Sequence, residues 1–219
     1  MTDVHDSSSA PLELLRKYKI NAIVTIDDAK DAVPIARALG EAGIHSLEIT
    51  MRTPAALKAI ERVAAECPWL TVGAGTVLTP EAARGVRDAG GKFCIAPGLN
   101  PAMVEWCLSN SMAVFPGVAT GTEMEAAVRL GLSVLKVWPV EPLGGVPYLR
   151  ILGGPFRMIE WIPSGGLGLE HLQSYLEYDK VVACGCVWFA PPEVVKAQKF
   201  DLVRDAAHKA VTIADSIGR

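Results

Sequence analysis

The sequence predicts an α/β protein, namely a (β/α)8 TIM barrel with an extra N-terminal helix. Eight short apolar runs alternate with helix-like segments along the chain. They recur about every 20 to 26 residues, which is the length of one strand, one loop and one helix. Eight parallel strands that are each followed by a helix close into a barrel. An open doubly wound sheet is the alternative that similar units could build.

Turn-forming residues help to place the elements along the chain. The runs that predict strands cover residues 21–26, 45–50, 70–77, 92–98, 112–118, 133–140, 158–166 and 181–189. Thr-Pro or Asn-Pro pairs at residues 53–54, 79–80 and 100–101 predict helix starts, because proline is tolerated at the first helical position. Gly43 predicts the end of another helix, since glycine readily adopts the left-handed conformation of a C-cap.

The two ends of the chain predict further segments. Residues 9–19 predict a helix packed under the barrel, and residues 200–217 predict the last helix. Residues 1–8 are expected to form a disordered tail. No linker or low-complexity stretch interrupts the sequence, so residues 1–219 are expected to form a single domain.

Composition excludes several classes of protein. Half of the residues are hydrophobic, which is enough for a large core. The net charge is -3 and there is no basic run, so nucleic-acid binding has no electrostatic support. No apolar stretch approaches the roughly 20 residues that span a bilayer, and the polar N-terminus lacks the apolar core of a signal peptide. A cytoplasmic location without a membrane partner is therefore expected.

Cysteine and histidine give no sign of a metal site. The five cysteines are odd in number, and three of them lie in strand-like runs, which favours reduced, buried thiols. Cys184 and Cys186 form a CGC pair that could be a metal or redox motif, but the spacing does not match CxxC. None of the four histidines lies near acidic or cysteine residues at ligand spacing. We therefore expect neither a metal nor another cofactor.

Lys136 and Glu48 are charged residues inside apolar runs. Lys136 lies in SVLKVWPV and Glu48 in SLEITMRTP. Burial disfavours the charged ammonium, and the neutral amine is the nucleophile that forms a Schiff base with a carbonyl. Glu48 could transfer protons. The alternative is a structural ion pair between the two across the barrel. Arg52, at the end of its strand, suits a bound carboxylate, or else a salt bridge to Glu48.

Two further segments suggest ligand contacts at the C-terminal ends of the strands, where barrel active sites lie. Thr76 follows two glycines in VGAGTVL and could hold a small polar ligand, although glycine in a strand can simply aid packing. Residues 163–166, PSGG, follow the seventh run and precede a helix, where backbone N–H groups favour an anion. A plain tight turn is the alternative.

Taken together, these motifs resemble one enzyme family. The segments LEITMRT, VGAGTVL, FCIAPGL, VFPGVAT, LKVWPVE and PSGG are similar, in order and spacing, to the 2-keto-3-deoxy-6-phosphogluconate (KDPG) aldolases. The wider group includes 4-hydroxy-2-oxoglutarate aldolases. The resemblance covers about residues 20–200. It implies a class I, Schiff-base aldolase, a lyase that cleaves KDPG to pyruvate and glyceraldehyde 3-phosphate without a metal, and a homotrimer.

The resemblance also implies a role for individual residues. Lys136 matches the Schiff-base lysine and Glu48 the general acid–base residue. The residues that match substrate-binding positions are Arg52 and Thr76 for the pyruvate carboxylate, Pro97 and Trp138 for the pocket walls, and Gly165, Gly166 and Gly185 for the phosphate end.

Two departures from the family pattern fall on the phosphate end. The family often has Gly-Gly-Ser before the tryptophan of strand eight, where this chain has Gly185-Cys186-Val187, and valine has no side-chain donor. The first strand also lacks the usual Pro-Val-Ile stretch. Aldolases for 4-hydroxy-2-oxoglutarate or for the galactonate-type sugar acid therefore stay open. So does a phosphate-binding isomerase or epimerase, which would not need Lys136. A non-enzymatic binding barrel would not explain the match of Lys136, Glu48 and Arg52.

Overall fold

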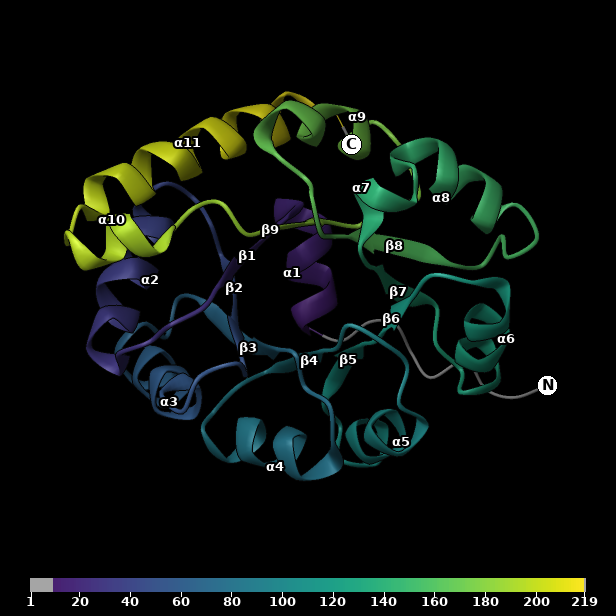
Figure 1. Cartoon of the computed structure of the whole chain (residues 1–219), viewed down its shortest axis with the longest axis horizontal. Coiled ribbons are helices and arrows are strands. Elements are labelled where there is room, and N and C mark those ends of the chain that lie inside the picture. Colours follow the sequence, from purple (N-terminus) through teal and green to yellow (C-terminus); the bar gives the residue numbers. More distant parts are fainter. Residues whose placement is uncertain (1–9, 219) are drawn as a thin grey trace.

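The computed structural model describes residues 10–218 and has an α/β fold with parallel, curled sheets inside a ring of helices (Figure 1). The strands are β1 (Ile20–Val24), β2 (Ser46–Thr50), β3 (Thr71–Gly75), β4 (Phe93–Ile95), β5 (Ala113–Phe115), β6 (Gly117–Val118), β7 (Val134–Val137), β8 (Glu160–Pro163) and β9 (Cys184–Cys186). Each of the eight apolar runs therefore contains a strand. The expected disordered tail, residues 1–8, lies outside the described residues.

The helices follow the strands along the chain. They are α1 (Ala10–Tyr18), α2 (Ala32–Glu41), α3 (Ala56–Glu66), α4 (Pro80–Asp88), α5 (Pro101–Ser109), α6 (Gly121–Arg129), α7 (Val140–Leu143), α8 (Gly145–Gly153), α9 (Leu172–Leu176), α10 (Pro192–Lys196) and α11 (Phe200–Ser216), with 3-10 turns η1 (Ala29–Asp31) and η2 (Leu169–His171). None of the helices within residues 10–218 has the length and apolar character that crossing a membrane requires.

The hydrogen-bonded ladders divide into two parallel sheets. Six strands run in the order β5-β4-β3-β2-β1-β9, and three run in the order β6-β7-β8. The fifth run is split at Pro116, which has no N–H to donate; β5 pairs with β4 and β6 pairs with β7. Isolated bridges, Trp161 with Val181 and Ser164 with Gly185, connect the β8 side to the β9 side. The expected parallel α/β arrangement is confirmed, with two ladders in place of one continuous eight-stranded sheet.

Helix boundaries follow local capping chemistry. Thr79 caps α4 by accepting the N–H of Ala82, and Asn100 caps α5 in the same way, each followed by proline as expected. Gly43 follows α2 with a φ of +95°, a conformation that favours glycine. The predicted helix start at residues 53–54 is wrong. The hydroxyl of Thr53 donates to the carbonyl of Ile26 in the neighbouring loop, and α3 begins only at Ala56.

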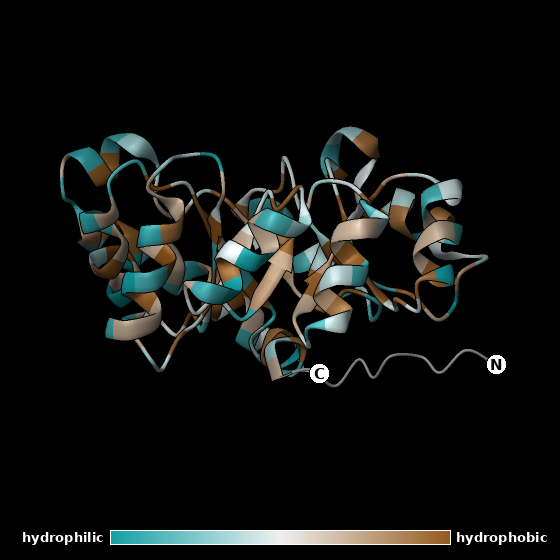
Figure 2. Ribbon diagram, turned by 90° about the horizontal axis from the view of Figure 1, so that it is seen from below, coloured by the Kyte–Doolittle hydropathy of each residue, from teal (hydrophilic) through white to brown (hydrophobic). Residues whose placement is uncertain are grey.

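The N-terminal helix α1 closes the end of the ring at which the strands begin. Leu12 and Leu15 are buried with Phe93, Ile95, Phe115, Val134, Ile162, Val182 and Ala183. In Figure 1, α1 lies across the centre of the ring. A larger core joins the outer faces of the strands to the surrounding helices, and Figure 2 shows hydrophobic strands between helices of mixed character. The predicted extra helix is therefore confirmed, and the opposite end of the ring is left for the site.

Candidate active site

Lys136 and Glu48 come together inside the ring. Lys136 is on β7 and Glu48 is on β2, with the Lys136 Nζ atom 3.6 Å from the Glu48 Oε1 atom. The Lys136 side chain is 9 % exposed and that of Glu48 is 2 % exposed. A buried ion pair gains electrostatic strength from its surroundings but leaves a costly charge if either partner is lost. The geometry confirms that the two residues meet and brings an amine and an acid–base group to one point.

The carboxylate of Glu48 is also held by groups that the sequence interpretation did not single out. Asn21, on β1, donates from Nδ2 to Glu48 Oε2 at 2.7 Å. The Ser46 hydroxyl donates to Asn21 Oδ1, also at 2.7 Å. All three side chains are buried. The pairing of β1 with β2, in which Ala22 lies opposite Leu47, places this polar chain on the inner face.

The glycines of β3 make room for these side chains. A Cβ atom on Gly75 would overlap the Oε1 atom of Glu48, and a Cβ on Gly73 would lie 2.5 Å from the ring of Phe93. Both distances are shorter than real Cβ contacts. Gly75 is therefore required by the position of the Glu48 carboxylate, and Gly73 by the packing of the ring interior.

Arg52 and Thr76 lie together where β2 and β3 end. The Arg52 Nε–H donates to the Thr76 Oγ1 atom at 3.1 Å. Thr76 has a φ of +59°, an uncommon value for a residue with a Cβ, and this turns its hydroxyl toward Arg52. Among residues 10–218, no ion pair joins Arg52 to Glu48, since Glu48 pairs with Lys136. The guanidinium is exposed and has further donors for a carboxylate.

The predicted pocket walls lie on neighbouring loops. Trp138 follows β7 and is 40 % exposed. A Cβ on Gly165 would be 2.7 Å from the Cδ1 atom of Trp138, so the glycine turn lies directly against the indole. Pro97 follows β4, and its carbonyl contacts Gly117 so closely that a Cβ there would overlap it. Trp138 and Gly165 thus contact each other beyond the ends of β7 and β8, and Pro97 lies against Gly117 of β6.

The PSGG turn differs in one respect from the expectation. Gly165 and Gly166 have φ values of +91° and +81°, so both need glycine. The next regular segment is the 3-10 turn η2, and the short helix α9 begins only at Leu172. The predicted helix N-terminus is therefore not directly at the turn, because Leu167, Gly168 and the 3-10 turn η2 intervene. Backbone N–H groups of the turn remain the available donors.

Glu141 stabilises the PSGG turn through hydrogen bonds of its backbone and its side chain. Its backbone N–H donates to the carbonyl of Gly165 at 3.1 Å. Its carboxylate accepts a hydrogen bond from the hydroxyl of Tyr175 on α9. Burial, together with the nearby carboxylate, raises the pKa of Tyr175 far above its usual range, so the phenol remains a donor. The side chains of α7 and α9 thereby fix the backbone on which Gly165 and Gly166 lie.

The eighth run serves mainly for packing. Gly185 pairs with Asn21 of β1, and a Cβ on it would lie 3.0 Å from Ile23 and from Ser164. Val187 is 54 % exposed just beyond β9. All five cysteines are buried and none forms a disulfide, in agreement with the predicted reduced thiols. Burial raises the pKa of the Cys186 thiol to about 12, so it stays protonated and inert near neutral pH.

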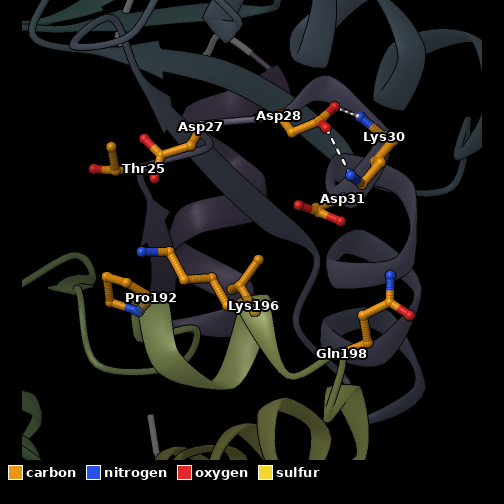
Figure 3. Close-up of a pocket in the computed structure, with 9 residues that line it drawn as sticks. Thr25, Asp27, Asp28, Lys30, Asp31, Pro192, Lys196 and Gln198 are labelled. Atoms are coloured by element: carbon orange, nitrogen blue, oxygen red, sulfur yellow. Dashed lines mark hydrogen bonds and ion pairs between the residues drawn. The ribbon is translucent and has the colours of Figure 1, made fainter.

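A pocket of about 340 Å³ lies beside the mouth of the ring, between the loop after β1 and helix α10 (Figure 3). Its lining residues are Thr25, Asp27, Asp28, Lys30, Asp31, Pro192, Val195, Lys196 and Gln198. Asp28 and Lys30 form an ion pair at 2.8 Å. The hydroxyl of Thr25 bonds that of Thr50, two residues beyond Glu48 on β2, at 2.8 Å. The pocket therefore borders the Glu48 strand. Within residues 10–218, no cluster of three or more His, Cys, Asp or Glu side chains is arranged to hold a metal.

Comparison with known proteins decides the family. The model of the family described as "Aldolase: KDPG and KHG aldolase" matches residues 12–206. The chain belongs to this aldolase family. A "2-dehydro-3-deoxy-phosphogluconate aldolase" of Treponema pallidum is 38% identical to it over 92% of this chain and 96% of the relative. The family resemblance found in the sequence motifs is thereby confirmed.

Solved structures of aldolases have the same fold. A KDPG aldolase of Legionella pneumophila, with pyruvate captured at low pH as a covalent carbinolamine intermediate, is 31% identical with a TM-score of 0.88, covering 92% of this chain and 98% of that one. A KDPG aldolase of Zymomonas mobilis, with 3-phosphoglycerate, is 31% identical with a TM-score of 0.85, covering 97% of each chain. This aldolase-family chain therefore has the family's fold over nearly its whole length.

Proposed function

We propose that this aldolase-family protein is a class I aldolase that cleaves KDPG to pyruvate and glyceraldehyde 3-phosphate, with Lys136 as the Schiff-base residue. The observation that carries the proposal is the buried Lys136 Nζ atom 3.6 Å from Glu48 Oε1. An amine in a poorly hydrated interior beside a carboxylate has both a nucleophile and a proton acceptor within reach of one substrate.

The proposed reaction uses the groups in a definite order. Lys136 gives its ammonium proton to Glu48 and adds to the keto carbon of the substrate. The former keto oxygen then leaves as water with the proton from Glu48, and the resulting protonated imine accepts electrons. Glu48 takes the proton of the C4 hydroxyl, the C3–C4 bond breaks, and its electron pair forms the enamine while C4 leaves as an aldehyde. Protonation of C3 and hydrolysis of the imine then release pyruvate. Arg52 and Thr76 hold the substrate carboxylate, and the protonated imine supplies the electron sink without a cofactor.

The carbon chain and the phosphate of the substrate are assigned to the residues that follow β4, β7 and β8. Trp138 and Pro97 border the carbon chain. The backbone N–H groups at Gly165 and Gly166 bind the phosphate, supported by their positive φ values. Gly185 contributes by leaving room between Ile23 and Ser164.

The first experiment is borohydride trapping. The protein is incubated with pyruvate, reduced with borohydride, digested and analysed by peptide mass spectrometry. We expect a reduced pyruvyl adduct on Lys136 and none in Lys136→Arg, because a guanidinium does not form the imine. An absence of adduct in the folded wild-type protein would refute the Schiff-base mechanism. Full catalytic activity in Lys136→Ala would instead favour an isomerase or epimerase, because those reactions would not need Lys136.

An aldolase for an unphosphorylated 2-keto acid, such as 4-hydroxy-2-oxoglutarate, is the second candidate. Two observations favour it. Three carboxylates, Asp27, Asp28 and Asp31, line the pocket beside β1 together with two ammonium groups, Lys30 and Lys196. The lining is therefore net negative, which disfavours a phosphate dianion. The exposed residue after β9 is Val187, whose side chain cannot donate. The ratio of kcat/KM for KDPG and for 4-hydroxy-2-oxoglutarate separates the two candidates, with KDPG expected to be preferred. The value of kcat/KM for the phosphorylated galactonate-type sugar acid is measured in the same comparison.

We also propose a single closed (β/α)8 domain that assembles as a homotrimer in the cytoplasm. The bridges from β8 to β9, and the bond from the Lys136 N–H on β7 to the carbonyl of Pro116 directly after β5, support closure of the two sheets into one barrel. The family resemblance supports the trimer, and five buried cysteines without a disulfide suit a reducing compartment. Light scattering coupled to gel filtration should give three times the chain mass of 23.3 kDa.

A further inference from the structure

We propose that Asn21 is a positioning residue for Glu48, and that Ser46 sets the orientation of Asn21. The inference rests on the proposed function, in which Glu48 transfers the protons. Its basis is a continuous chain of buried hydrogen bonds, from the Ser46 hydroxyl to Asn21 Oδ1 and from Asn21 Nδ2 to Glu48 Oε2, each 2.7 Å long.

The burial of this chain calls for an explanation. Asn21 and Ser46 are both 0 % exposed, on strands whose residues are all buried. A buried amide without hydrogen-bond partners is strongly unfavourable, so such groups persist only where they are bonded. Asn21 has one partner on each end of its amide. One of those partners is the carboxylate next to Lys136, so the chain ends at the site of the proposed chemistry.

Ser46 determines which end of the amide meets the carboxylate. The ionised carboxylate only accepts hydrogen bonds, so it requires the Nδ2 end of Asn21. The Ser46 hydroxyl donates to the Oδ1 end and keeps the amide in that orientation. Glu48 Oε2 is thereby occupied by a donor that has no lone pair to accept a proton in return.

The other carboxylate oxygen, Glu48 Oε1, is then the one that exchanges protons with the substrate. Glu48 Oε1 faces Lys136 Nζ at 3.6 Å and is enclosed on the other side by Gly75 of β3. With Oε2 held by Asn21, the carboxylate cannot rotate freely, and a proton taken from the substrate resides on Oε1. In the pyruvate half-reaction, Oε1 accepts a proton from the C3 methyl group of the imine. The C–H electron pair becomes the C2–C3 double bond of the enamine, and the C=N π pair of the protonated imine moves to the nitrogen.

The test separates imine formation from proton transfer. Imine formation is followed by borohydride trapping of pyruvate on Lys136, and proton transfer by exchange of the pyruvate methyl protons in D2O, measured by NMR. Asn21→Leu keeps a similar volume and removes the donor. We expect trapping within twofold of the wild type, and methyl exchange slower by about 10- to 100-fold, the size of effect that misplacement of a catalytic group produces.

Ser46→Ala and Lys19→Met complete the design. Ser46→Ala keeps the donor and frees the amide, so a smaller loss of exchange is expected, with no additional loss when it is combined with Asn21→Leu. Lys19, directly before β1, is also buried, and its ammonium donates to the carbonyls of Ala214 and Ile217, at the end of the strand away from Glu48. Lys19→Met should lower the melting temperature and leave the ratio of exchange to trapping unchanged.

The outcomes distinguish failure of the proposed aldolase function from failure of the positioning role of Asn21. No adduct in the wild type would overturn the proposed function itself. Normal trapping together with wild-type exchange in Asn21→Leu, or an equal fall of trapping and exchange, would overturn the positioning role. If Asn21→Leu does not fold, Ser46→Ala decides the question, and unchanged exchange in that variant rejects the inference.

Discussion

At the scale of single residues, the site depends on opposite charges held where water has little access. The Lys136 and Glu48 side chains are 9 % and 2 % exposed. Each ion therefore relies on the other, and on the hydrogen bond from Asn21, in place of hydration. This dependence links the stability of the protein directly to the groups that carry the proposed chemistry.

Loss of the ammonium alone should destabilise the fold. Lys136→Met leaves Glu48 buried without its cation, and we expect the free energy of unfolding to fall by about 3–5 kcal/mol. Urea unfolding followed by circular dichroism measures the change. The double variant Lys136→Met/Glu48→Leu removes both charges and should recover part of the loss. An equal or larger loss in the double variant would contradict the pairing.

Gly75 offers a change in position without a change in charge. In Gly75→Ala the added Cβ would overlap Glu48 Oε1, so the carboxylate must move. We expect kcat to fall by about 100-fold, since displacements near 1 Å have effects of this size. Gly121→Ala, which adds a Cβ in open space at the start of α6, is the matched control and should keep wild-type kcat. Equal kcat values for the two variants would contradict displacement of the Glu48 carboxylate by the added Cβ.

At the scale of elements, the glycine turn after β8 combines a backbone requirement with a contact. Gly165→Ala introduces a Cβ at a φ of +91° and 2.7 Å from Trp138. We expect KM for the phosphorylated substrate to rise about tenfold or more, because the phosphate-binding N–H groups move. Gly43→Ala has a similar φ of +95° but lies after α2, and should lower stability without changing KM. Equal effects of the two changes on KM would show that the turn binds nothing.

The elements also show how far the sequence alone could lead. The strands β1 to β9 follow from the eight apolar runs, and Lys136 and Glu48 from charged residues inside those runs. The role of Asn21 depends on β1 lying beside β2 in a particular register, which no local pattern contains. The false helix start at residues 53–54 has a similar cause, since Thr53 bonds a carbonyl of a different loop. In both cases a hydrogen bond to a residue distant in the sequence determines what the side chain does.

At the scale of the whole molecule, the ring has one closed end and one open end. Helix α1 fills the closed end with Leu12 and Leu15, and the proposed chemistry lies at the other. Leu15→Ala should lower the free energy of unfolding by about 2–5 kcal/mol, because it leaves a cavity in a fully buried position. Activity at low temperature should persist.

Thermal unfolding together with an activity assay tests this separation of the two ends. Leu202→Ala, on the exposed side of α11, is the matched control and should change stability little. If Leu15→Ala lost activity while still folded, the closed end would be coupled to the site, contrary to the division of the interior described above.

The position of Trp138 has a practical consequence. Its indole is 40 % exposed and lies against Gly165, where the phosphate of the proposed substrate would bind. Indole emission depends on hydration, so a ligand that displaces water from this wall should shift the intrinsic fluorescence of the protein toward shorter wavelengths. The chain also contains Trp69, Trp106, Trp161 and Trp188, so loss of the shift in Trp138→Phe is what assigns it to this indole. The protein therefore carries its own optical reporter of occupancy, and ligand titrations can be followed without any added dye.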